Sequence, residues 1–287
     1  MLDQRISAKT LRFAVLGESL AHTWSPQIHN SLFSAADLDA VYLPITVPKE
    51  KLSSAVDVLR SCFSGFNVTI PYKERIMPML DELDAAALAC GAVNTVENRE
   101  GRLIGHITDG LGMMRAIEEG GINTHAVSAL VLGGGGAARV ACYEILTRGG
   151  NVQIAVRNPQ KGKQLAKELA DAQTDSMKRI CVSTLEAVTG EYDIAINCTP
   201  VGMYPKIDES PISGDVISRC KAVFDAVYNP RETRFLQLAR EQGIPAIEGL
   251  GMLYYQAVEA EKFWFGADAI CNDETQKRIY HELLEQM

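Results

Sequence analysis

The sequence of 287 residues lacks any long hydrophobic run and any excess of positive charge. Charged residues interrupt each apolar stretch before it reaches a membrane-spanning length, and the opening Met-Leu-Asp-Gln-Arg has no apolar core of a signal peptide. The net charge of -8 disfavours a nucleic-acid-binding surface. We therefore expect a cytoplasmic protein with neither a nucleic-acid nor a membrane partner.

Paired cysteines are also missing. The seven cysteines are scattered, odd in number and without a C-x-x-C spacing. Cysteines of this kind are typical of reduced core residues, with metal ligation or nucleophilic catalysis a remote second interpretation. No metal site is predicted. The composition, 47% hydrophobic and 22% charged without repeats, is that of a globular protein long enough for two domains.

A glycine-rich segment near the middle of the chain is the most informative feature that is present. The apolar run 129–132 leads into Gly133, Gly135 and Ala138, which keep the spacing G-x-G-x-x-G/A of a dinucleotide-binding turn. A helix over about 136–148 would direct its free N–H groups toward a pyrophosphate. An ordinary glycine-rich loop between a strand and a helix is the alternative.

The residues that follow this turn bear on the choice of dinucleotide. The next predicted strand, 152–156, ends in Arg157-Asn158-Pro159, with Lys161 close behind. An acidic residue at such a position holds the ribose of NAD, whereas an arginine suits a 2'-phosphate. NADP is therefore favoured, although Arg157 and Lys161 are also ordinary surface residues at a strand end.

Alternating strands and helices indicate an α/β fold with two domains. Residues 98–101 have the composition of a hairpin turn, and helices over about 252–265 and 273–286 are predicted to return to the first domain. We expect 1–108 plus 251–287 to form a substrate-binding, catalytic domain, 109–250 to form a doubly wound nucleotide-binding domain, and the cleft to lie between them. The other predicted elements are strands near 12–17, 41–47, 65–70, 92–97 and 102–107, helices near 26–38, 49–62, 72–89 and 109–119, and strands near 129–133, 180–183, 193–197, 222–226 and 245–247.

Polar residues at strand ends of the first domain are the candidates for chemistry. Asn67, Thr69 and Lys73 lie where the strand 65–70 passes Pro71 into a predicted helix. A desolvated lysine can exchange the proton that an alcohol–ketone conversion requires, but a solvated lysine at a helix start is the alternative. Asp109 is either a catalytic residue or only the cap of the helix 109–119.

Seven stretches together carry a resemblance that covers essentially the whole chain. It resembles the shikimate dehydrogenases and the closely similar quinate/shikimate dehydrogenases. The resemblance implies a Rossmann domain and the NADPH-dependent, reversible reduction of 3-dehydroshikimate to shikimate in aromatic amino acid biosynthesis, with Lys73 and Asp109 as the acid–base pair. The stretches are 15–30, 67–74, 91–95, 108–110, the glycine turn, 197–203 and 249–256.

The resemblance also implies the remaining site residues. Thr23 and Ser25, with Tyr228 as a third hydroxyl, would bind the substrate carboxylate, and the ring hydroxyls would meet Asn67, Thr69, Asn94, Asp109 and Gln256. Ser25 before Pro26 is alternatively a helix N-cap, and Gln256 an exposed helix residue. His22, His29, His106 and His125 are interpreted as structural. The expected cofactor-binding residues are Gly133, Gly135, Gly136, Ala137, Arg157, Lys161, Thr199 and Gly249.

Three departures from the family pattern affect these expectations. Thr23 replaces the first serine of the usual Ser-x-Ser, Ile107 replaces an asparagine before Thr-Asp-Gly, and Val156-Arg157-Asn158 replaces Asn-Arg-Thr, with Lys161 at a position often held by arginine. A quinate/shikimate dehydrogenase using NAD or NADP is the close alternative function, and a non-catalytic nucleotide- or metabolite-binding protein is the alternative of another class. The expected oligomeric state is a monomer or a homodimer.

Overall fold

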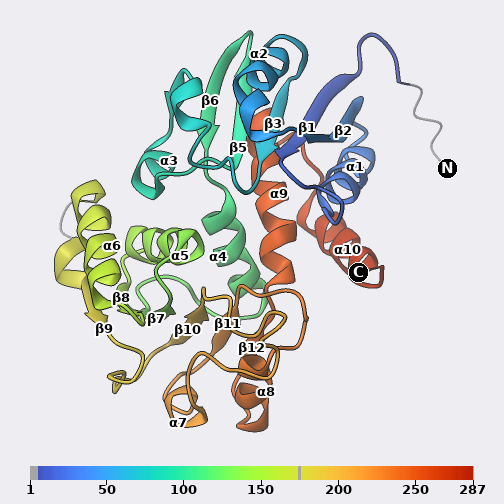
Figure 1. Cartoon of the computed structure of the whole chain (residues 1–287). Coiled ribbons are helices and arrows are strands. Elements are labelled where there is room, and N and C mark those ends of the chain that lie inside the picture. The colour runs from blue at the N-terminus through green and yellow to red at the C-terminus, as the bar shows by residue number, and fades with distance from the viewer. Residues whose placement is uncertain (1–5, 174–175, 287) are drawn as a thin grey trace. The chain divides into compact units, whose positions relative to one another are not determined.

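The computed structural model describes residues 6–173 and 176–286. The chain divides into two compact units, one of Met1–Thr108 with Gln256–Met287 and the other of Asp109–Tyr255. Each unit is built of strands and helices in alternation, which confirms the predicted α/β class (Figure 1). Within the described residues, no helix combines the length and the apolar character needed to cross a membrane.

The first unit contains a mixed six-stranded sheet in the order β2-β1-β3-β5-β6-β4. The first strand, β1, pairs in parallel with β2 and β3, whereas β5 is antiparallel to both β3 and β6. The strands are β1 (Leu11–Gly17), β2 (Ala40–Thr46), β3 (Gly65–Val68), β4 (Glu82–Leu83), β5 (Thr95–Arg99) and β6 (Arg102–His106).

Helices cover this sheet and complete its core. The helix α9 (Leu250–Phe265) begins in the second unit and ends in the first, where Trp264 and Phe265 pack on Phe13 of β1. Figure 1 shows the C-terminal α10 beside α1, two segments that are in contact although they lie at opposite ends of the chain. The helices of the first unit are α1 (Ser25–Ala35), η1 (Lys49–Lys51), α2 (Leu52–Cys62), η2 (Met77–Met79), α3 (Ala85–Cys90) and α10 (Asp273–Leu284).

The second unit contains a parallel six-stranded sheet in the order β12-β11-β10-β7-β8-β9. Counted from β7, this is the order 6-5-4-1-2-3 of a doubly wound nucleotide-binding fold, in which ligands bind where the order reverses, beside β7 and β10. The strands are β7 (Ser128–Leu132), β8 (Asn151–Ala155), β9 (Ile180–Ser183), β10 (Ile194–Asn197), β11 (Val223–Asp225) and β12 (Ala246–Ile247).

Buried aliphatic side chains of these strands explain why they form the centre of the unit. Ala129, Leu130, Val131 and Leu132 are all fully buried, as expected for a central parallel strand that is covered on both faces. The helices of the second unit are α4 (Asp109–Glu119), α5 (Gly136–Thr147), α6 (Pro159–Ala172), η3 (Ser176–Arg179), α7 (Gly214–Ile217) and α8 (Arg234–Glu241).

The single helix predicted over 72–89 is wrong. Residues 71–76 form turns, and the chain then passes through η2, β4 and α3. Pro78 cannot donate a backbone hydrogen bond, and Asp84 starts a new helix because its side chain accepts from the N–H of Ala87 at 2.7 Å. Lys73 consequently lies in a turn instead of at a helix start.

The hairpin predicted at 98–101 is confirmed. Glu100 and Gly101 both have positive φ, 55° and 90°, and the Asn98 side chain accepts from the N–H of Gly101 at 2.8 Å. This is the backbone that a tight two-residue turn between antiparallel strands requires. It aligns β5 with β6, so that Thr95 pairs with His106 near the segment that leads to Asp109.

Candidate active site

The glycine turn after β7 has the backbone shape that a dinucleotide requires. Gly133 has a φ of 114°, and a Cβ added there would lie 3.0 Å from the carbonyl oxygen of Cys198, so a side chain is excluded. Added Cβ atoms at Gly135 and Gly136 would meet nothing within 4 Å. A phosphate can therefore approach the backbone over Gly135 and Gly136, and Ala137 follows in the first turn of α5.

The start of α5 supports the same interpretation. Its N-cap residue is Gly135, which offers no side-chain cap to the first N–H groups of the helix. These N–H groups and the positive end of the helix dipole favour an anion. Ala138, the third position of the motif, is fully buried, which allows α5 to pack closely on the sheet. The turn fits the pyrophosphate of a dinucleotide.

Arg157 and Lys161 follow β8, where the ribose of such a cofactor is held in doubly wound folds. Both side chains are exposed, and among the residues that the structure describes neither forms an ion pair. Asn158 caps α6 by accepting from the N–H of Gln160 at 3.0 Å, which fixes the backbone between the two basic residues. The pair is thus available to a 2'-phosphate.

A buried polar network joins the carboxyl ends of β10 and β11. The side chain of Asn197 donates to Asp225 Oδ1 at 2.8 Å and accepts from the Thr199 hydroxyl at 2.7 Å. Asp225 also accepts from the Thr233 hydroxyl at 2.6 Å and from the N–H of Val227 at 3.0 Å. Burial is the largest influence on Asp225 and raises its pKa to about 6, against the lowering effect of these hydrogen bonds.

This network positions the predicted cofactor residues Thr199 and Gly249. A Cβ added at Gly249 would lie 2.5 Å from the carbonyl oxygen of Asp225, so this glycine is required by close backbone approach. Asp225 was not among the predicted residues, because an acidic residue at the end of a short strand gives no sign in the sequence of being buried. Tyr228 follows the network and exposes 47% of its surface.

In the first unit, Thr23 and Ser25 lie together at the start of α1. The Thr23 hydroxyl donates to Ser25 Oγ at 3.2 Å, and both residues are half-buried. The N-cap of α1 is Trp24 without a side-chain hydrogen bond, so the alternative role of Ser25 as the cap is wrong. With its hydroxyl not needed by the helix, Ser25 is available to a ligand.

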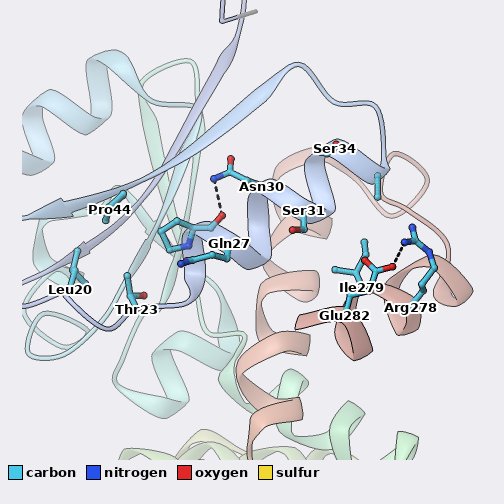
Figure 2. Close-up of a pocket in the computed structure, with 12 residues that line it drawn as sticks. Leu20, Thr23, Gln27, Asn30, Ser31, Ser34, Pro44, Arg278, Ile279 and Glu282 are labelled. Atoms are coloured by element: carbon cyan, nitrogen blue, oxygen red, sulfur yellow. Dashed lines mark hydrogen bonds and ion pairs between the residues drawn. The ribbon is translucent and has the colours of Figure 1, made fainter. Parts of the chain in front are cut away.

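Thr23 also borders a surface hollow of about 870 Å³ that runs along α1 to α10. Figure 2 shows short polar side chains of α1 lining it, with the Arg278–Glu282 ion pair at the far end. Ser25 is not among the residues that line this hollow.

The amide side chains of Asn67 and Asn94 lie in one hydrogen-bonded cluster. Asn67 Nδ2 donates to the carbonyl oxygen of Asn94 and to the Thr95 hydroxyl, each at 3.0 Å. Asn94 in turn donates to Gln256 Oε1 at 3.1 Å and accepts from the N–H of Thr108 at 2.7 Å. Gln256 is only 8% exposed, so its alternative role as an exposed helix residue is wrong.

Thr69 and Lys73 follow β3 in the same unit. The N–H of Thr69 donates to Leu16 O at 3.0 Å, and the carbonyl oxygen of Lys73 accepts from the N–H of Val93 at 2.8 Å. The second contact ties the lysine to the segment that carries Asn94. Lys73 is half-buried.

Asp109 is the first residue of α4 and belongs to the second unit. It is half-buried, and a carboxylate in a first turn interacts favourably with the helix dipole. This placement suits both the catalytic and the capping interpretation.

The histidines and cysteines differ in their surroundings. His22 and His125 are exposed, whereas His29 and His106 are buried and pair with Glu261 and Asp84. All seven cysteines are free, but only Cys90, Cys142, Cys220 and Cys271 are buried, so the prediction of core cysteines holds for four of them. No group of three or more potential metal ligands occurs among the described residues.

Comparison with known proteins relates these features to one group of enzymes. The sequence profile of the shikimate dehydrogenase substrate binding domain matches residues 15–96. The shikimate dehydrogenase (NADP(+)) of Carboxydothermus hydrogenoformans is 38% identical over 264 residues, covering 91% of this chain and 94% of the relative.

Solved structures agree with this relationship over nearly the full length. A shikimate dehydrogenase in complex with NADP+ aligns with a TM-score of 0.89 at 36% identity, covering 99% of both chains. The shikimate 5-dehydrogenase of Thermus thermophilus, solved with NADP(H) and shikimate, aligns with a TM-score of 0.83 at 33% identity, covering 95% of this chain and 99% of the other.

Proposed function

The chain belongs to the shikimate dehydrogenase family, and from this premise we propose that it is an NADP-dependent oxidoreductase that interconverts 3-dehydroshikimate and shikimate in aromatic amino acid biosynthesis. The observation that carries the proposal for this chain is the turn over Gly133–Gly136. Its backbone excludes a side chain at Gly133 and leaves Gly135 and Gly136 open, as a bound pyrophosphate requires.

NADP is the proposed cofactor because of the basic pair beyond β8. Arg157 offers a planar set of donors suited to a 2'-phosphate, and Lys161 adds a second positive charge. No ion pair engages Arg157 among the described residues, so its guanidinium is available to such a phosphate. When bound, NADPH supplies the hydride for the reduction.

In the proposed reaction, Lys73 holds the proton at Nζ that the carbonyl oxygen takes up as the alcohol forms. Asp109 acts as its partner in this acid–base step. In the reverse direction, the neutral amine takes this proton back from the alcohol, so the half-buried Lys73 serves both directions of the reaction. The residues themselves thus supply the proton transfer that must accompany hydride transfer.

The remaining groups are proposed to recognise a ring acid that carries several hydroxyls. The hydroxyls of Thr23, Ser25 and Tyr228 bind its carboxylate. The polar groups of Thr69, Asn94 and Gln256 form hydrogen bonds with its hydroxyls, and Asn67 is hydrogen-bonded to Asn94. Hydroxyl and amide groups suit this task because they both donate and accept. Thr199 and Gly249 complete the cofactor side through the Asp225 network.

The compartment and assembly are proposed on separate grounds. The seven free cysteines fit a reducing compartment, which supports the cytoplasm. For assembly we retain the monomer or homodimer expected from the sequence; sedimentation of the purified protein distinguishes them.

The function is tested by following NADPH absorbance with the purified protein, with shikimate and quinate each paired with NADP and with NAD. Activity restricted to shikimate with NADP is expected. Activity with quinate or with NAD would assign the chain to the related quinate/shikimate dehydrogenases, and inactivity in all four reactions would refute the proposal. Lys73→Ala serves as the control that separates this activity from a contaminating dehydrogenase.

A further inference from the structure

A carboxyl group and an imidazole are buried together in the core of the first unit, outside the proposed catalytic pair. Glu261 of α9 is 1% exposed, and His29 of α1 is fully buried. Glu261 Oε1 lies 2.9 Å from His29 Nδ1, and within the described residues this is the only ion-pairing contact of Glu261. A buried carboxyl without an Arg or Lys partner is unusual and calls for a physical account.

Aromatic rings enclose the imidazole and prevent it from turning. It stacks on Tyr42 with ring centroids 4.1 Å apart and an interplanar angle of 13°. Trp264 and Phe33 contact it at centroid distances of 5.2 and 5.9 Å. Glu261 and Tyr42 are the titratable groups in contact with His29 in this surrounding, and burial also raises the pKa of Tyr42.

Burial disfavours charge on both members of the pair. It lowers the pKa of His29 to about 3 and raises the pKa of Glu261. Both directions favour a protonated carboxyl that donates to Nδ1 of a neutral imidazole. In that state the imidazole carries its own proton on Nε2.

The hydrogen bonds of Asn67 fix the orientation of its amide and are compatible with the same tautomer. Its Nδ2 must point to the carbonyl oxygen of Asn94, because a carbonyl can only accept. Asn67 Oδ1 therefore points the other way, where the Tyr42 hydroxyl donates to it at 2.6 Å. The Asn67 side chain also lies close enough to His29 to raise the pKa of the imidazole, against the larger effect of burial. Nε2 of His29 is buried and has no hydrogen-bond partner in the described part of the chain, so an N–H there still requires an acceptor, which the oxygen of Asn67 can supply.

We propose that His29 and Glu261 form a neutral, proton-sharing pair whose Nε2–H fixes the amide of Asn67, and that both are positioning residues for the reaction. Tyr42 and His29 then supply two donors to Asn67 Oδ1, while Nδ2 donates to Asn94 and Thr95. All four hydrogen-bonding positions of the amide are occupied by the protein. Asn67 thus acts by holding its neighbours in place.

The positions held in this way are those proposed to meet the substrate. Asn94 donates a hydrogen bond to Gln256. The Thr95 hydroxyl lies 3.2 Å from the hydroxyl of Thr108, the residue before Asp109. The consequence for catalysis therefore rests on the proposed function, in which Asn94 and Gln256 recognise the ring hydroxyls. The pairing itself does not depend on it.

The test compares Glu261→Gln, which still donates to Nδ1, with Glu261→Leu, which does not. Phe33→Leu is the matched control, because it alters the packing of the same imidazole without touching a hydrogen bond. For each purified full-length variant, kcat and KM for shikimate with NADP are measured together with the melting temperature. Nitrogen NMR of the full-length protein reports the protonation of His29 and the side-chain amide of Asn67.

We expect Glu261→Gln to keep kcat/KM within about twofold of the parent, and Glu261→Leu to lower it by about tenfold through loss of one buried hydrogen bond, without losing NADP affinity. Phe33→Leu should lower the melting temperature but leave kcat/KM within about twofold. The Asn67 amide signals should shift in Glu261→Leu and not in Glu261→Gln.

An imidazolium at His29 in the parent would overturn the neutral pair, as would loss of activity in Glu261→Gln equal to that in Glu261→Leu. A loss of kcat/KM in Phe33→Leu as large as in Glu261→Leu would reduce the effect to core packing and overturn the positioning role. If the parent has no activity with shikimate, the proposed function fails, and the NMR signals of His29 and Asn67 still decide the pairing.

Discussion

Replacing Asp225 by asparagine should remove a pH dependence of stability from the second unit. The side chain is fully buried at the ends of β10 and β11, and burial raises its pKa from 3.8 to about 6. Asparagine has the same shape, and its oxygen can keep the hydrogen bonds from Asn197 and Val227. The substitution therefore removes the titration while preserving most of the network.

The direction follows from which state binds the proton more tightly. Between about pH 4 and pH 6 the folded state keeps the proton on Asp225, whereas the unfolded state, with the ordinary pKa, has released it. The contribution of Asp225 to the stability of the parent therefore falls as the pH rises through this interval and is level above it. A shift of about two units corresponds to about 3 kcal/mol, and for a unit of this size to about 6–12 °C in melting temperature.

The assay is thermal unfolding of the parent and of Asp225→Asn at several pH values from about 4 to 7.5, followed by circular dichroism. Taking the difference between the two proteins cancels the groups that titrate in both. We expect Asp225→Asn to gain stability relative to the parent as the pH rises, and to stop gaining above about pH 6. A difference that stays constant over the interval would refute the raised pKa and the burial argument behind it.

Three further predictions test the site, the last with a control substitution. Lys73→Ala should lower kcat by about 10²- to 10⁴-fold with NADPH affinity nearly intact, measured by steady-state kinetics and fluorescence titration; unchanged turnover would remove Lys73 from the acid–base role. Arg157→Ala should weaken NADP binding by about tenfold or more and leave NAD binding unaltered in calorimetry, whereas equal losses for both cofactors would point to a merely structural arginine. Gly249→Ala should cost about 1–3 kcal/mol in denaturant unfolding because its Cβ would meet the Asp225 carbonyl, while Gly136→Ala, in open space, should change stability by less than about 0.5 kcal/mol; similar values for the two would contradict the close approach.

The second unit was the more predictable because its local signals and its tertiary structure agree. A strand that is apolar from Ala129 to Leu132, a glycine turn and a helix occur in that order at 128–147, and each signal is strong by itself. The helix predicted over 72–89 failed for the opposite reason. Pro78 and the cap at Asp84 divide that segment, and β4 forms only by pairing with β6, which lies about 20 residues further along the chain and cannot be seen locally.

The buried polar groups were the least predictable. His29, Glu261 and Asp225 are ordinary residues in the sequence, and their burial results from the packing of segments as distant as α1 and α9. Periodicity indicates which face of a helix is apolar, but it does not indicate which polar residue on that face will find a partner. Such groups become visible only when the hydrogen bonds of the folded chain are known.

The departure at Ile107 is explained by the same hydrogen bonds. Residue 107 is 4% exposed and apolar, so it contributes packing in place of the amide usual in the family. The next residue, Thr108, is held by Asn94. The Oδ1 of Asn94 accepts from the N–H of Thr108 at 2.7 Å, and its Nδ2 donates to the Thr108 hydroxyl at 3.0 Å. Because Thr108 directly precedes Asp109, polar support for this part of the backbone is supplied one residue after Ile107. An isoleucine at this position is therefore compatible with a fixed Asp109 and gives no reason to assign the chain a non-catalytic role.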